Sequence, residues 1–494
     1  MNDGPMNAER LLAHFEKIAD APDAIARLRR FILDLAVRGK LVPQDVKDEP
    51  ASELLKRIAK EKLDQAGLPQ GWRRAKIGSI LDFQYGKGLK ASERLDEGPV
   101  PVFGSNGIVG FTDEPLTDRP AIIVGRKGSA GALNLCDGPS WTTDVAYFVE
   151  VPSFLDLRFM LNALAALDLD KLGKGVKPGL SRSEAYDQII DLPPLAEQHR
   201  IVAKVDELTG LCDRLEAGRA GREVVRDRLA SASLARLNAP DPETFQADAR
   251  FALGALSALT TRPDQIKALR QTILNLAMRG RLLEGTSARA AFVGDYRTLQ
   301  NGYAFKSAWF SKHGVRLLRN ANIGHGEIRW NDVVHLPEDR LCEFERFQLN
   351  EGDVVLTLDR PFIVTGTKVA RVSGDDLPSL LLQRVGRFVE TSPGLDDDYL
   401  FLWINSPHFN DQIDPGRSNG VPHISSRQVE AAEIFVPPLA EQHRIVAKVD
   451  ALMAICDRLE ASLTAATTTR ARLLESLLTE ALAPADDREL EAAE

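Results

Sequence analysis

The sequence has few cysteines and no long apolar run. Only 4 of its 494 residues are cysteine, and two of these, Cys212 and Cys456, occupy equivalent positions of an internal repeat. So few cysteines do not form a disulfide framework, and we expect reduced, buried thiols in a cytoplasmic protein. No run of about eighteen apolar residues is present, so we expect no membrane-spanning helix. The first residues, MNDGPMNAER, lack the basic and then apolar pattern of a signal peptide.

Motifs that carry catalysis are also missing. The glycine-rich segment 125–131 lacks the Lys-Ser/Thr ending of a phosphate-binding loop, and 103–107 lies between β-type runs without a βαβ unit. His199 and His443 each stand in E-Q-H-R at the expected start of a helix, with no second His or Cys three or four residues later. That spacing favours a surface or interhelical contact over a metal site. We therefore expect a protein that is not an enzyme and binds no metal.

The charge balance is acidic rather than basic. The net charge of −9 argues mildly against a free-standing protein that coats nucleic acid, because such proteins are usually basic. Part of the negative charge lies in the tail after Ala483, which we interpret as a solvated end. At 494 residues the chain is too long for one hydrophobic core, so three or more structural units are expected.

A long internal repeat dominates what the sequence does contain. Residues 193–217 and 437–461 match at 21 of 25 positions, and the first 14 are identical. Each copy opens with two prolines and continues with apolar residues at alternating steps of three and four, the pattern of a coiled-coil seam. The pattern predicts two helices of roughly forty residues, or ~60 Å each. The seam residues of the first copy are Val205, Leu208, Cys212 and Leu215.

A second repeat shows that the whole chain is a tandem duplication. Residues 22–42 and 263–283 are identical at 12 of 21 positions. In the first copy Asp23 is the expected N-cap of a helix that ends at Gly39. Further amphipathic helices are predicted at 8–20 and 51–64.

The two middle segments differ in length by only three residues, yet their sequences barely resemble each other. Short β-type runs with Gly, Pro and Asn punctuation alternate with helical segments in both, which predicts mixed α+β domains. The expected strands lie at 99–111, 120–126 and 144–151, and at 314–323, 352–358 and 384–390; the expected helices lie near 157–167 and 398–404.

Cationic and amide side chains gather in the glycine-rich loops of these segments. Arg, Lys and Asn are the types that read guanine and adenine edges in the major groove, while other cations only contact phosphates. Charged turn residues are often merely solvated, so the clustering carries more weight than any single position. The candidate DNA-binding residues are Lys87, Lys90, Ser105, Asn106, Arg126, Lys127, Lys174, Lys177, Arg182, Lys306, Arg316, Arg319, Asn320, Arg360, Arg417, Asn419 and His423.

Together these features resemble the specificity subunit of a type I restriction–modification system. The motifs are the doubled PPLAEQHRIVAKVD, the doubled helical block ending RGKLVPQ or RGRLLEG, and LPQGW at 68–72. The resemblance covers nearly the whole chain. It implies an α+β fold with two target recognition domains, each reading half of a split DNA sequence. Long antiparallel helices at 194–238 and about 437–481 would separate the two domains with pseudo-twofold symmetry.

The same resemblance implies the domain plan and the partners. The expected domains are an N-terminal helical block at 1–44, recognition domains at 45–192 and 286–436, a helical spacer at 193–285, and a long helix with an acidic tail at 437–494. The expected partners are double-stranded DNA, two methyltransferase (M) subunits and restriction (R) subunits. S-adenosylmethionine, ATP and Mg are expected on those partner subunits, and no cofactor is expected in this chain.

One departure and two alternatives remain. Gly218 and Gly221 interrupt the first long helix and predict a break or uneven pairing there, since each costs about 1 kcal/mol relative to Ala. One alternative function is a coiled-coil scaffold that binds only proteins. The other is the specificity module of a self-contained restriction–methylation enzyme, which would need a Rossmann domain or a carboxylate metal cluster that no motif here supplies.

Overall fold

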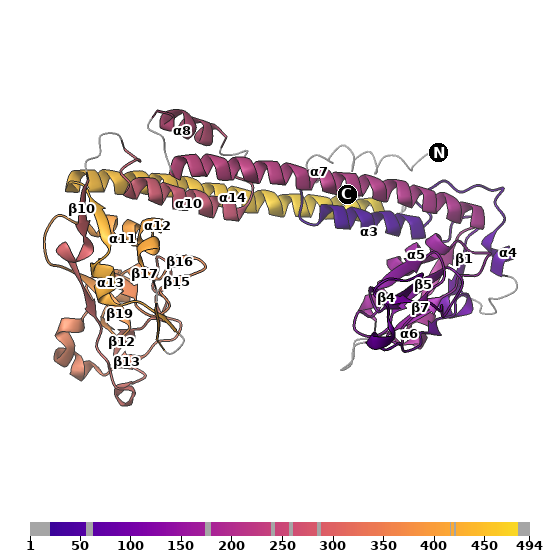
Figure 1. Ribbon diagram of the computed structural model, residues 1–494, viewed down its shortest axis with the longest axis horizontal. Helices are drawn as coiled ribbons and strands as arrows, with labels where there is room; N and C mark the ends of the chain where they lie inside the picture. The colour runs from indigo at the N-terminus through magenta and orange to yellow at the C-terminus, as the bar shows by residue number, and fades with distance from the viewer. Residues whose placement is uncertain are drawn as a thin grey trace, which may run out of the picture. The chain divides into compact units, whose positions relative to one another are not determined.

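The computed structural model describes residues 20–55, 63–172, 179–238, 243–255, 260–283, 288–414, 416–418 and 421–482. Its chain divides into two compact units, and Figure 1 shows the elements of both. The first unit holds residues 1–222 and 467–494, and the second holds residues 223–466. The helix predicted at 8–20 lies outside the described residues, as does most of the helix predicted at 51–64, of which α4 (Ala51–Leu55) is described.

The first unit contains a globular domain, residues 73–192, built from two sheets and a covering helix. One sheet has the strand order β2-β8-β5-β6 and the other has β4-β3-β7, while β1 pairs with β9. The strands are β1 (Arg73–Lys76), β2 (Gln84–Tyr85), β3 (Val100–Gly104), β4 (Gly107–Thr112), β5 (Ala121–Gly125), β6 (Leu133–Cys136), β7 (Trp141–Thr142), β8 (Ala146–Val149) and β9 (Ile189–Leu192). The helices are η1 (Ile77–Ser79), η2 (Ala91–Glu93), α5 (Leu157–Ala166), η3 (Leu169–Lys171) and α6 (Arg182–Tyr186).

The central strand β5 is buried on both faces, which explains its unbroken apolar run. Ile122 and Val124 belong to the core that includes Phe159 and Met160 of α5. Ile123 lies in a separate core with residues of β3 and β8. The domain is therefore layered, with α5 on one face of the four-stranded sheet and the three-stranded sheet on the other.

The globular domain of the second unit, residues 289–436, repeats this topology despite its unrelated sequence. Its sheets have the orders β11-β19-β14-β17 and β13-β12-β18, and β10 pairs with β22. In both domains the middle strand of the three-stranded sheet has one antiparallel and one parallel neighbour. The strands are β10 (Arg289–Phe292), β11 (Arg297–Asn301), β12 (Val315–Leu318), β13 (His335–Leu336), β14 (Val354–Thr357), β15 (Phe362–Ile363), β16 (Gly366–Thr367), β17 (Val369–Arg371), β18 (Ser379–Leu381), β19 (Val385–Glu390), β20 (Gly416–Ser418), β21 (Val421–His423) and β22 (Glu433–Val436).

The helices of the second domain also follow the first. The α11 helix takes the place of α5, and α13 takes the place of α6, while the hairpin β15–β16 has no counterpart among the described strands of the first domain. The helices are η4 (Val293–Asp295), η5 (Ser307–Trp309), η6 (Glu338–Phe347), η7 (Gly374–Asp376), α11 (Asp397–Ile404), α12 (Pro407–Gln412) and α13 (Ser426–Glu430). The predicted mixed α+β domains are confirmed. The run 99–111 is a hairpin of β3 and β4 rather than one strand.

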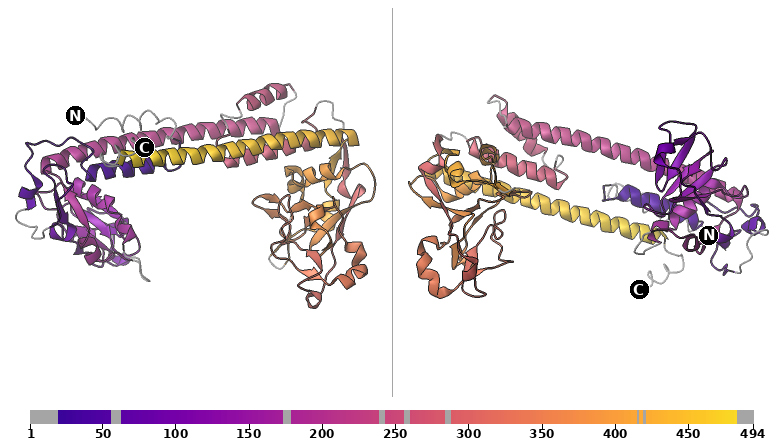
Figure 2. Two further views of the ribbon diagram at one scale, coloured as in Figure 1. Left: turned by 180° about the vertical axis from the view of Figure 1, so that it is seen from behind. Right: turned by 60° about the horizontal axis from the view of Figure 1, so that its bottom comes forward.

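Two helices of 44 residues, α7 (Leu195–Asn238) and α14 (Leu439–Leu482), follow the doubled proline motif. Within each unit a segment of α7 and a segment of α14 run antiparallel (Figures 1 and 2), and the predicted long helical repeat is confirmed. The break expected at Gly218 and Gly221 is wrong, because α7 is continuous through both. Both glycines are exposed and carry no packing role, so the intact hydrogen-bonded helix tolerates their cost. In the described residues no helix is both long and apolar enough to cross a membrane.

A short helix in each unit packs on the long helices. In the first unit α3 (Ala24–Val37) shares a core with the seam residues Val205 and Cys212, and a second core with Leu474 and Leu477 of α14. In the second unit α10 (Pro263–Met278) packs with Val449 and Cys456 of α14. The seam residues therefore face the short helices. Leu215 departs from the seam pattern, because it is 39% exposed. Helix α8 (Phe245–Gly254) precedes α10 (Figure 2).

Equivalent ion pairs fasten the short helices. Arg29 of α3 lies 2.5 Å from Asp213 and 2.9 Å from Glu216 of α7. Arg270 of α10 lies at the same two distances from Asp457 and Glu460 of α14.

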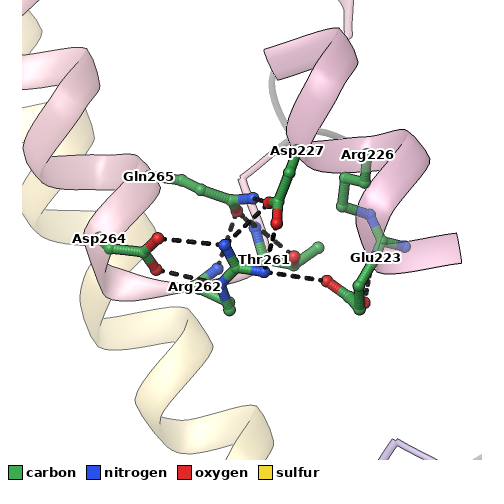
Figure 3. A network of polar contacts seen from close by, with 7 residues as sticks. All are labelled: Glu223, Arg226, Asp227, Thr261, Arg262, Asp264 and Gln265. Atoms are coloured by element: carbon green, nitrogen blue, oxygen red, sulfur yellow. Dashed lines mark hydrogen bonds and ion pairs between the residues drawn. The ribbon is translucent and has the colours of Figure 1, made fainter. Parts of the chain in front are cut away.

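The starts of the two short helices differ. Asp23 is the N-cap residue of α3, as predicted, but its φ is +54° and its side chain makes no capping hydrogen bond. Arg262 is the N-cap residue of α10 and lies 2.8 Å from Asp227 and 3.3 Å from Glu223 of α7, and 3.1 Å from Asp264 (Figure 3). The first copy has Ala21 where the second has Arg262. The described end of α3 agrees with its sequence, since Gly39 has the positive φ of a helix terminator.

Candidate nucleic-acid interface

The repeated E-Q-H triplet attaches each globular domain to its long helix. The buried Gln198 side chain accepts the N–H of Asp156 at 2.9 Å and donates to the carbonyl of Pro193 at 3.0 Å. In the second unit Gln442 accepts the N–H of Asp396 at 2.8 Å and donates to the carbonyl of Pro437 at 2.7 Å. Because Asp156 and Asp396 cap α5 and α11, each glutamine fixes the start of the covering helix.

The neighbouring residues of the triplet extend this attachment. His199 lies 3.6 Å from Asp156, and His443 lies 3.4 Å from Asp396, so both histidines make the contacts between elements that their sequence context favours. Glu197 is buried and accepts the indole N–H of Trp72 at 3.1 Å, and this burial raises the pKa of its carboxyl. In the second copy, no described residue hydrogen-bonds the buried Oε2 of Glu441.

Two predicted arginines of the first globular domain meet at one exposed aromatic ring. The guanidinium carbon of Arg126 lies 4.9 Å from the centroid of the Tyr85 ring, and that of Arg182 lies 5.2 Å from the same centroid. Arg126 follows β5, Arg182 begins α6, and Tyr85 ends β2, so three separate elements converge here. This cluster of Tyr85, Arg126 and Arg182 is called the Tyr85 cluster below.

Other predicted residues surround the Tyr85 cluster. Lys127 pairs with Gly179 in an isolated bridge, at the end of the predicted loop that carries Lys174 and Lys177. Those two lysines lie outside the described residues. The β3–β4 turn holds Ser105 and the exposed Asn106, and it lies against the loop after β5, since the Ser105 carbonyl would be only 2.5 Å from a Cβ added at Gly125.

The two remaining lysines among the predicted residues of this domain lie in the loop after β2. Lys87 is exposed, and its ammonium lies 5.7 Å from the centroid of the Trp141 ring, whose N–H donates to the Lys87 carbonyl at 2.9 Å. Lys90 is exposed at the start of η2, where its N–H donates to Glu93. The structure thus brings Arg126, Lys127 and Arg182 together, while Lys90 belongs to a neighbouring turn.

In the second globular domain the equivalent loop carries a different set of polar groups. Asp359 pairs with His423 in an isolated bridge, as Lys127 pairs with Gly179 in the first domain. The Nδ1 atom of His423 lies 2.9 Å from the Asp359 carboxylate, and Arg384 lies 3.7 Å from the same carboxylate. The predicted Arg360 is exposed beside them, and its φ is +49°.

The other predicted residues of this domain are dispersed. The ammonium of Lys306 lies 5.3 Å from the centroid of Trp309. Arg316 donates to the carbonyls of Asp375 and Leu377 at 2.8 and 2.9 Å, and its guanidinium lies over Trp330.

Four further predicted positions remain to be placed. Arg319 forms an ion pair with Asp332 at 2.7 Å, and Asn320 accepts a hydrogen bond from Lys368 through its carbonyl. Arg417 lies on β20, and Asn419 lies outside the described residues. The side chains of Arg316 and Arg319 therefore stabilise the folded domain through contacts within it.

Sequence reasoning missed the residues that position these cations. Tyr85, Trp141, Asp359 and Arg384 are not among the candidates, although each contacts one. Tyr85 stands two residues before Lys87 in YGKGLK, so an aromatic residue among cations was a usable signal. Asp359 gave no such signal, because only the fold brings it to His423. In the described ranges no group of three or more His, Cys, Asp or Glu side chains is placed to hold a metal.

Comparison with known proteins gives a consistent result. Residues 69–221 and 312–467 match the family described as "Type I restriction modification DNA specificity domain". The chain is 31% identical to the type I restriction enzyme EcoAI specificity subunit of Escherichia coli, over 92% of this chain and 93% of that protein. It is 23% identical to the EcoEI specificity subunit of the same organism, over 93% of this chain and 94% of that one.

A solved structure supports the fold. It is described as "Structural basis underlying complex assembly and conformational transition of the type I R-M system". The alignment covers 84% of this chain and 98% of that chain, with a TM-score of 0.51 at 16% identity.

Proposed function

The chain belongs to the family of type I restriction–modification specificity subunits, and we propose that each globular domain binds one half of a bipartite DNA target. The observation that carries this proposal is the shared topology of two domains with unrelated sequences, each attached by the same E-Q-H triplet to a repeated helix. A duplicated frame that presents two different loop surfaces is suited to reading two different half-sites. A protein-only scaffold and a self-contained restriction–methylation enzyme find no support in the descriptions of the relatives.

The proposal includes a division of labour with partner subunits. Double-stranded DNA is bound by this chain, and two methyltransferase subunits and restriction subunits bind its helical frame. S-adenosylmethionine, ATP and Mg are carried by those partners, and this chain contributes specificity without catalysis. The absence of catalytic motifs from the sequence supports this assignment. We also propose that the complex acts in the cytoplasm.

The DNA interface is formed by the loops around the Tyr85 cluster and around Asp359 and His423. These loops occupy equivalent positions, because Leu180 donates to the Arg126 carbonyl as Ile424 donates to the Leu358 carbonyl. In the first domain Lys87 and Lys127 would contact phosphates, while the arginines and Asn106 would contact base edges. In the second domain the DNA contacts would be made by Arg360, Arg384 and His423.

A domain exchange tests the proposal. We expect the chain, expressed with its methyltransferase partner, to direct methylation to a split sequence with a fixed gap. Replacing residues 286–436 with the equivalent segment of another family member should change one half of that sequence and leave the other half and the gap unchanged. The measurement is methylation mapping by whole-genome sequencing. A change in both halves, or methylation without a split sequence, would contradict the proposal.

A further inference from the structure

The Tyr85 cluster has a more specific role than general DNA contact. Resting on the proposed DNA-binding function, we propose that Arg126 and Arg182 read guanine in the half-site of the first globular domain, with Tyr85 as the residue that positions them. Guanine is the base whose major-groove edge offers two adjacent acceptors, N7 and O6, to one guanidinium group.

Neither guanidinium group has an acidic partner among the described residues, and Arg126 uses one N–H to donate to the carbonyl of Asp144 at 3.2 Å. Neither Arg126 nor Arg182 forms an ion pair there, in contrast to Arg319, whose charge is matched by Asp332. The Tyr85 ring that carries them is 51% exposed. Two unneutralised cations on an exposed ring form a surface that attracts acceptor groups, and stacking holds each guanidinium in a limited set of orientations.

The support beneath the cluster is rigid. The Tyr85 ring lies 5.1 Å from the ring of Tyr147, which is 1% exposed and whose hydroxyl donates to the carbonyl of Leu180 at 3.1 Å. A tyrosine hydroxyl is protonated at neutral pH, and burial raises the pKa of Tyr147 further. The Arg126 backbone donates to Val145 at 2.9 Å and accepts from Leu180 at 3.0 Å. Base contacts gain specificity from such preorganisation, because less rotamer entropy is lost on binding.

The second globular domain provides an internal comparison. Its strand register places Asn301 at the position of Tyr85 and Leu358 at the position of Arg126. Ser426 takes the position of Arg182, since each follows the capping serine of its helix. The cluster is therefore a property of the first domain, and its guanine preference should appear in only one half of the target.

The neighbouring lysines leave the arginines available for bases. Lys87 and Lys127 are exposed in the loops after β2 and β5, as point charges suited to phosphate. A planar guanidinium held on a ring offers parallel N–H groups instead, which match the paired acceptors of guanine.

The experiment compares single substitutions in the full chain bound to its methyltransferase partner. Duplexes with each position of the target randomised in turn are methylated, and the accepted bases are read by sequencing. We expect Arg126→Ala and Arg182→Ala to lower the preference for guanine at a position of one half-site by about tenfold or more. Tyr85→Leu should lower it at the same position, while Tyr85→Phe, which keeps the ring, should retain it.

A matched control is Arg119→Ala. Arg119 precedes β5 whereas Arg126 follows it, so the two lie at opposite ends of the strand; Arg119 is 78% exposed beside Glu150. This substitution should leave every base preference unchanged. Thermal unfolding of each variant shows whether it is folded. An arginine-to-alanine variant that is unfolded is replaced by Arg126→Lys or Arg182→Lys.

Several results would overturn the proposal without affecting the proposed function. One is a uniform loss of affinity at all bases with a smaller salt dependence, which would assign both arginines to phosphates. Another is a changed preference at a position that is not guanine, or no change at all. Failure of the unmodified complex to select any split sequence would instead contradict the proposed function itself.

Discussion

At the scale of single residues, the repeated glutamine is the most constrained part of the E-Q-H triplet. Gln198 and Gln442 are both fully buried, and each bridges the long helix and the cap of the covering helix. A buried amide that satisfies a backbone donor and a backbone acceptor leaves both unpaired when it is removed, at a cost of about 1–3 kcal/mol for each group. The duplication retains the triplet because both domains depend on this one side chain for their attachment.

This role predicts a local effect of Gln198→Leu. The apolar side chain keeps the volume but leaves the N–H of Asp156 unpaired, so peptides covering residues 153–166 should exchange their amide hydrogens faster. Peptides covering residues 393–404 should be unaffected, and Gln442→Leu should give the converse pattern. Hydrogen exchange with mass spectrometry measures both.

His199→Ala is the control for that experiment. The histidine side chain is 61% exposed and 3.6 Å from Asp156, so its removal should change exchange little. Equal exchange in the Gln198→Leu variant and the original chain would show that the glutamine does not hold the cap.

At the scale of elements, the two glycines of α7 show why propensity is a weak guide within a long helix. Gly218 and Gly221 weaken α7 locally, yet the hydrogen bonds of the surrounding turns and the packing of its ends maintain the helix. A Cβ added at Gly221 would meet nothing within 4 Å. No neighbouring atom requires glycine at either position, so the two glycines lower the stability of α7 without a steric need for them.

Accordingly, Gly221→Ala should stabilise the chain by about 0.5–1 kcal/mol. Gly131→Ala should instead destabilise the chain. Gly131 has φ +79°, and an added Cβ would lie 2.2 Å from the backbone nitrogen of Asp170. Thermal melts followed by circular dichroism should show a higher midpoint for the first variant and a lower midpoint for the second. A lower midpoint for Gly221→Ala would mean that α7 needs flexibility at this point.

Helices of this chain follow from local sequence signals, whereas its strand pairing does not. Periodicity and proline placement predicted α5, α11 and both long helices to within a few residues, because these signals are local. The shared topology of the two globular domains was not predictable, since it depends on strand pairing between distant residues. For the same reason the sequence located Arg126 and Arg182 on loops, but only the fold brings them to Tyr85.

At the scale of the whole molecule, the duplicated helices limit which features of the DNA target can change separately. The short helices are fastened by equivalent arginines, Arg29 and Arg270. The loops that would contact DNA differ at the positions of Arg126 and Arg182, which Leu358 and Ser426 take in the second domain. Conservation of the frame between copies and divergence of the loops allow the bases read to change independently of the gap between half-sites. The gap would then be set by the length of α7 and α14 alone.

The lengths of α7 and α14 should therefore determine the length of the unread gap. Inserting four residues into both α7 and α14 adds about one helical turn, or ~6 Å, which corresponds to roughly two base pairs at 3.4 Å each. We expect the unread gap to lengthen while both half-sites keep their sequences, as methylation mapping would show. Inserting the four residues into α7 alone is the control; it should abolish methylation, because antiparallel helices of unequal length shift the contacts of α3 and α10. An unchanged gap after the double insertion would mean that the helices do not set the spacing.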